Sequence, residues 1–179
     1  MQPFQKILKT LSAVANCDHY LFTLNDFQAI IPSYTRKNLK GVIRRIEKSG
    51  VLKRVCRGLY LYEQADYPRG LVLYHAAAHL RAGDFNYISL ESALSAAGII
   101  SQVLPNWITI ISSGRSHTIS CGNFGHIEFI HTKRPLQQLA AELTYDPTHH
   151  LWRASVKLAL HDMKITHRNQ DLIDKEAIK

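Results

Sequence analysis

Four apolar residues recur at helical spacing between Pro32 and Gly50. They are Leu39, Val42, Ile43 and Ile46. Their spacing of i, i+3, i+4 and i+7 predicts an amphipathic helix with one buried stripe. Ser33 is a candidate N-cap of this helix, and Gly50 is a candidate C-terminal stop. The next residues, up to Tyr62, are β-prone around a tight Arg57-Gly58 turn, so we expect a hairpin of two strands.

Two further helices are expected before this segment. Residues 3–16 carry an apolar stripe at helical spacing, and Thr23 with Asp26 forms a capping-box pattern for a helix that ends before Pro32. Three helices and a hairpin in roughly 60 residues match the size of a winged helix-turn-helix domain, which we place at residues 1–64. The polar segment Glu63–Gly70 is interpreted as a linker.

Residues 65–179 predict a mixed α/β domain with a small antiparallel sheet, so the expected fold class is α+β. Expected helices cover Leu71–Arg81, a short segment capped by Ser89, Leu136–Leu143 and Trp152–Met163. Expected strands cover Trp107–Ile111, Thr118–Cys121 and His126–Ile130. Because consecutive strands usually pair, we interpret these three strands as a meander.

The net charge of the chain is concentrated in one stretch. Pro32–Tyr62 holds nine basic residues against one acid, Glu47, and so accounts for the formal net charge of +8 of the whole chain. The remainder is neutral. A local positive field on one helix and one hairpin is typical of a nucleic-acid surface, whereas a merely solvated surface helix usually mixes both signs.

The candidate DNA-binding residues come from this helix and hairpin. They are Tyr34, Thr35, Arg36, Lys37, Lys40, Arg44, Arg45, Lys48, Lys53, Arg54 and Arg57. Helical geometry places Tyr34, Lys37, Gly41, Arg44 and Lys48 on the outward face. The first turn contains no acid, which favours a phosphate neighbour at the positive end of the helix dipole.

A second basic cluster is predicted in the C-terminal part. In a meander, the first turn and the exit of the third strand lie at the same edge. This would bring together Arg115, His117, His131, Lys133 and Arg134. Such a cluster suits a phosphate or an acidic partner, although loop charges are often only solvated.

Cysteine and histidine usage predicts neither a cofactor nor a metal site. The three cysteines have no C-x-x-C spacing, which favours the reducing cytoplasm. His75 and His79 have chelating i, i+4 spacing, but a third ligand is not evident and packing histidines are the expected interpretation. No signal peptide is predicted, since Lys6 and Lys9 interrupt the apolar residues near the N-terminus. No membrane span is predicted either, since the longest uncharged run contains Pro, Gly, Asn and several serines.

Three segments resemble the AbiEi-type antitoxins, transcriptional regulators of type IV toxin-antitoxin and phage-defence systems. The segments are SGVLKRVCRGLYLY at 49–62, YISLESALSAAGII at 87–100, and SGRSHTI with IEFIHTKRP at 113–119 and 127–135. The resemblance implies an N-terminal winged helix that represses its own operon by binding operator DNA, with inverted repeats as the expected site. It also implies a C-terminal domain that counteracts a partner nucleotidyltransferase toxin.

Two other function classes remain open from the residues alone. A metal-dependent nuclease targeted by its winged helix needs clustered carboxylates, and the acids outside the basic stretch are scattered. A protein-protein interaction module could use the basic helix to bind an acidic partner. The leading hypothesis is a DNA-binding repressor that is not an enzyme.

Overall fold

The computed structural model describes residues 2–101, 106–168 and 170–174. The fold is a mixed α+β fold with two separate sheets. The chain divides into two compact units, Met1–Gly70 and Leu71–Lys179. Within the described ranges, no helix combines the length and the apolar content that crossing a bilayer requires.

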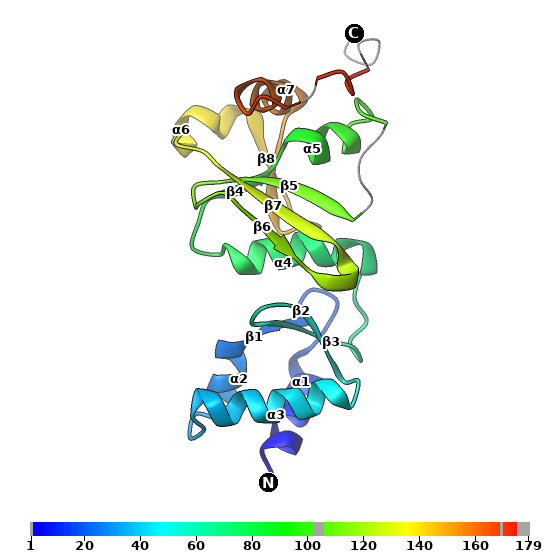
Figure 1. Ribbon diagram of the computed structural model, residues 1–179, viewed down its shortest axis with the longest axis vertical. Helices are drawn as coiled ribbons and strands as arrows, with labels where there is room; N and C mark the ends of the chain where they lie inside the picture. The colour runs from blue at the N-terminus through cyan, green and yellow to red at the C-terminus, as the bar shows by residue number, and fades with distance from the viewer. Residues whose placement is uncertain (1, 102–105, 169, 175–179) are drawn as a thin grey trace. The chain divides into compact units, whose positions relative to one another are not determined.

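The N-terminal unit contains three helices and a three-stranded antiparallel sheet (Figure 1). Its elements are α1 (Pro3–Val14), β1 (Leu21–Thr23), α2 (Leu24–Ile30), α3 (Arg36–Lys48), β2 (Leu52–Cys56) and β3 (Leu59–Tyr62). The sheet order is β1-β3-β2, so the strand before α2 pairs with the last strand of the hairpin. The short segment Leu21–Thr23, directly before α2, therefore completes the sheet as its third strand.

The core of this unit joins all three helices to the sheet. Phe27 is fully buried and packs against Phe22 and Tyr60. The predicted capping box is confirmed: the Thr23 hydroxyl accepts the Asp26 N–H, and the Asp26 carboxylate accepts the Thr23 N–H. This cap fixes where α2 begins, directly after the last residue of β1.

The segment predicted as a linker packs on the N-terminal unit. Tyr67 stacks on Tyr20 with ring centroids 4.9 Å apart, and Ala65 packs against the hydrophobic core. The Tyr67 hydroxyl also donates to Glu63 at 3.3 Å. These contacts make Glu63–Tyr67 part of the folded unit, because two aromatic rings bury one another there.

The C-terminal unit is built on a six-stranded mixed sheet. Its elements are α4 (Val72–Leu80), β4 (Asn86–Ile88), α5 (Leu90–Ala96), β5 (Trp107–Ser112), β6 (His117–Ser120), β7 (His126–His131), α6 (Leu136–Leu139), β8 (Leu143–Asp146), β9 (Leu151–Ala154) and α7 (Val156–Ile165), with short 3₁₀ turns η1 (Arg69–Leu71), η2 (Gly122–Phe124) and η3 (Ala140–Glu142). The sheet order is β6-β7-β5-β4-β9-β8. Figure 1 shows α4 on one face of the sheet and α5 with α7 on the other.

Three expectations for this unit are wrong. The strands β5, β6 and β7 do not form a meander, since β7 pairs parallel with β5 and β6 lies at the outer edge. Leu151–Ala154 is a strand rather than the start of a helix, and it pairs parallel with β4. The helix expected over Leu136–Leu143 ends after one turn and continues as η3 and β8. The sheet is consequently larger than predicted and mixed in direction.

Candidate nucleic-acid interface

One face of helix α3 is apolar and packs against the core. Its other faces carry the basic residues. Its buried residues are Leu39, Val42, Ile43 and Ile46, as the periodicity predicts. The N-cap, however, is Thr35, whose hydroxyl accepts the Asn38 N–H at 3.3 Å, and not Ser33. Gly50 ends the helix with a φ of +78°, a conformation that L-residues with a side chain rarely adopt.

The later start of α3 removes Tyr34 from the predicted outward face. Tyr34 precedes the helix, is half-buried and packs against the core of the unit. Its carbonyl oxygen accepts a hydrogen bond of 2.6 Å from the Gln28 side chain. Tyr34 is thus a packing residue at the turn between α2 and α3, and Thr35 serves as the cap.

A basic groove runs between α3, the hairpin and the start of α2. It has a volume of about 770 Å³. The cations that line it are Arg36, Lys40 and Arg44 on α3 and Arg54 and Arg57 on the hairpin. Below, the basic groove means this groove with its five lining cations. Because Arg36, Lys40 and Arg44 are spaced by four residues, they form one row along the side of α3 that borders the hairpin.

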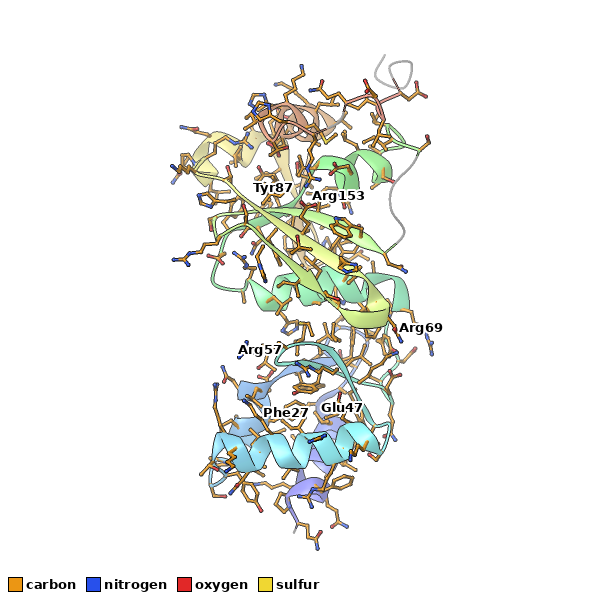
Figure 2. The ribbon with its side chains drawn as sticks, viewed as in Figure 1. Phe27, Glu47, Arg57, Arg69, Tyr87 and Arg153 are labelled. Carbon is orange, nitrogen blue, oxygen red and sulfur yellow. The ribbon has the colours of Figure 1, made fainter. Side chains whose placement is uncertain are left out.

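Two hydrogen bonds fix the shape of the basic groove. The Leu24 N–H, in the first turn of α2, donates to the Gly58 carbonyl oxygen at 3.1 Å, which holds the turn of the hairpin against α2. Arg36 donates from Nη2 to the Asn25 side-chain oxygen at 2.6 Å. The turn needs Gly58 at a φ of +82°. Figure 2 places Arg57 at this turn and Glu47 on α3.

The remaining candidate residues lie outside the basic groove. Lys37, Arg45 and Lys48 are exposed on α3, and Lys53 forms a 3.9 Å ion pair with Glu63. Gly41 is exposed between them, and a Cβ there would meet nothing within 4 Å. The outward side of α3 therefore has a gap in its side chains where another molecule's surface can approach the backbone.

Glu47 is the acidic residue of the basic groove. Tyr60, a half-buried residue of β3, lines the same groove. Burial raises the pKa of Tyr60, Arg54 acts to lower it and Glu47 acts to raise it. Both charges thus act on one hydroxyl. Among the described residues Glu47 forms no ion pair, so its carboxylate reduces the positive potential of the groove.

The predicted second cluster is only partly assembled. The His131 N–H donates to the Ser116 hydroxyl at 2.9 Å, and His131 Nδ1 lies 2.9 Å from the Gly114 carbonyl oxygen. The β5–β6 turn, which contains the exposed Arg115, therefore does lie beside the end of β7. His117 and Lys133 are also exposed.

Arg134, the last residue of the predicted cluster, binds a buried acid. Its Nη2 donates to the buried Asp162 carboxylate and to the Tyr87 hydroxyl, and the latter bond is 3.1 Å long. Asp162 additionally accepts from the Ser89 hydroxyl at 2.6 Å, so Ser89 bonds to a distant helix instead of capping α5 with its side chain. Arg134 is therefore paired with a buried acid.

Sequence analysis missed Asp162, although its position carried a signal. Asp162 is completely buried on α7, where Leu158, Ala159 and Met163 form the apolar stripe. An acid within an apolar stripe is rarely buried without a cationic partner. Burial raises the pKa of the adjacent Tyr87, and the Asp162 charge raises it further.

His75, the first of the two histidines at helical spacing, packs in the interior of the C-terminal unit. His75 is buried, its Nε2 lies 2.8 Å from the Thr148 carbonyl oxygen, and its ring stacks on that of His150. Within the described part of the chain, no three His, Cys, Asp or Glu side chains are placed to hold a metal ion together.

Comparison of the sequence with protein-family models and with curated proteins found no match. The proposed function consequently depends on the geometry above and on the resemblance of individual segments.

Proposed function

We propose that the chain is a sequence-specific DNA-binding transcriptional repressor whose N-terminal unit acts as a winged helix-turn-helix. The order α1-β1-α2-α3-β2-β3, with β1 paired to β3, supports this proposal. In helix-turn-helix proteins the second helix of the motif enters the major groove, a role that α3 would take here. The hairpin β2–β3 would then contact the neighbouring sugar-phosphate backbone.

The observation that carries the proposal is the basic groove itself. Five cations, three on α3 and two on the hairpin, line this groove, and Glu47 is the acid in its lining. A phosphodiester backbone carries regularly spaced negative charge and fits a row of cations at helical spacing. The exposed Lys37 and Lys48 on the outward side of α3 are positioned for further contacts, and the gap at Gly41 leaves room for base edges.

Salt dependence of binding to duplex DNA tests this function. With about six to eight phosphates neutralised, the slope of log K against log salt concentration should be about −5 to −7 for the full chain. Fluorescence anisotropy with a labelled random duplex measures the slope. A slope near zero, or equal affinity for an acidic polypeptide such as polyglutamate, would favour a protein-binding module instead.

We further propose that this repressor is a cytoplasmic antitoxin that counteracts a nucleotidyltransferase toxin. The segments 49–62, 87–100, 113–119 and 127–135 support this by their resemblance to the AbiEi-type antitoxins. Co-expression with a nucleotidyltransferase encoded beside this chain tests it, and restored growth is the expected outcome. If growth stays arrested although the chain still binds DNA, the regulator is not an antitoxin. We propose no catalytic role.

A further inference from the structure

A second groove lies on the C-terminal unit, between α7 and the segment formed by α6 and η3. It has a volume of about 910 Å³, which is within the usual size of small-molecule sites. Its apolar lining comes from Leu139, Val156, Leu158 and Leu160. Leu139 and Leu158 are buried, while Val156 and Leu160 are half-buried one turn apart on α7. An apolar molecule could therefore cover the accessible part of this lining.

Arg134 provides a fixed cation in this groove. One side of its guanidinium is bound to Asp162 and Tyr87, and its Nε donates to the Thr132 hydroxyl at 3.4 Å. Within the part of the chain that the structure describes, its Nη1 makes no hydrogen bond. The side chain is 24% exposed and lines the groove. Because the buried carboxylate orients the guanidinium, little side-chain entropy is lost when an anion binds.

The rim of the groove also carries a cation, Lys164, and the imidazole of His161. Both side chains line the groove, are exposed, and form no ion pair among the residues that the structure describes. Glu142 is the acid of the lining, and Lys157 neutralises it at 2.8 Å. Hydrogen bonds from Lys157 and Ser155 lower the pKa of Glu142, so it stays ionised and paired at neutral pH. The charges left without an internal partner are therefore positive.

We propose that this groove binds a small amphiphilic anion, with a carboxylate or phosphate head at Arg134 and Lys164 and an apolar body on Leu160 and Val156. The combination of an apolar lining with a few convergent charged groups is characteristic of ligand sites. A cationic amphiphile would place its charge beside Arg134 and Lys164, and a simple anion would leave the apolar lining uncovered. The inference is independent of DNA binding, because every residue in it belongs to the C-terminal unit.

Four probes separate the contributions of head and body. Isothermal titration of the full chain with octanoate should give saturable binding with a Kd on the order of 0.1 to 1 mM, as expected for a ligand of about ten heavy atoms. Octyl phosphate should bind at least as tightly, since a guanidinium N–H donates to a phosphate oxygen as well as to a carboxylate oxygen. Octylammonium and acetate should each bind about tenfold more weakly or not at all. The ratio of the octanoate and octyl phosphate constants identifies the preferred head.

Two groove variants and one matched control locate the site. Lys164→Glu reverses a rim charge, and Leu160→Gln removes part of the apolar lining while keeping a good helix former. Each should weaken octanoate binding about tenfold. Lys9→Glu changes the net charge by the same amount at an exposed residue of the N-terminal unit that does not line the groove, and it should leave the Kd within about twofold.

The proposal is overturned by any of three results. The first is octylammonium binding as tightly as octanoate, and the second is equal weakening by Lys9→Glu and Lys164→Glu. The third is no saturation by octanoate up to about 10 mM. Far-UV circular dichroism of each variant shows whether it is folded. If Lys164→Glu fails to fold, Leu160→Gln and the four probes on the unmodified chain still decide the question.

Discussion

Replacing Arg36, Lys40 and Arg44 together by alanine is expected to weaken binding to duplex DNA by about 100- to 1,000-fold near 0.1 M salt. These residues form the α3 row of the basic groove. Each phosphate contact contributes a slope of about −0.9 to the salt dependence, so the slope should also become shallower by about 2 to 3. Fluorescence anisotropy over a range of salt concentrations measures both quantities.

A control with the same loss of charge separates the groove from a general charge effect. Lys6→Ala, Lys9→Ala and Lys133→Ala remove three exposed cations that do not line the basic groove. This triple variant should lose less than about tenfold, because salt screens charges that make no direct phosphate contact. Equal losses in both triple variants would show that α3 is not the interface. Glu47→Gln should act in the opposite direction and tighten binding to all duplexes.

Arg134→Met is expected to destabilise the C-terminal unit by about 3 to 5 kcal/mol, because it leaves the buried Asp162 carboxylate without its cation. Asp162 is completely buried and retains only hydroxyl donors from Ser89 and Tyr87 in this variant. Urea unfolding followed by tryptophan fluorescence measures the change. The two tryptophans, Trp107 and Trp152, both lie in this unit, so the signal reports on it alone.

The double variant Arg134→Met with Asp162→Asn tests whether the unpaired charge causes the loss. A neutral amide can still accept from Ser89, so much of the stability should return. Lys133→Met, at the exposed neighbouring residue, should change stability by less than about 0.5 kcal/mol. If Arg134→Met were as stable as Lys133→Met, the ion pair would contribute nothing to the fold.

Local signals predicted the N-terminal elements well. The apolar spacing of α3 and the Thr23–Asp26 capping box depend on residues within one or two turns of each other, and both are confirmed. The position of the α3 cap was two residues off because Ser33 and Thr35 are both good capping residues. Only the packing of Tyr34 into the core distinguishes them, and sequence alone does not show it.

The C-terminal sheet was harder to predict because its pairings join distant segments. β5 is flanked by β4 and β7, and its last five residues are buried. The nearly continuous apolar run from Trp107 to Ile111 is typical of such a central strand and could have argued against a meander. β9 was mistaken for helix because four residues give little periodicity and α7 follows almost at once. The contact between Arg134 and Asp162 likewise spans 28 positions.

The order of strands in the C-terminal sheet has a consequence for synthesis on the ribosome. β4 lies between β5 and β9, and β9 is the last strand within the residues that the structure describes. All strands of the N-terminal unit are complete at Tyr62, whereas one side of β4 has no partner until Ala154 has left the exit tunnel. A chain at this stage exposes an unpaired strand edge, which other nascent chains or chaperones can bind. Slow codons placed shortly before the codons for β9 should therefore reduce the yield of folded protein, while the same codons placed after Tyr62 should not.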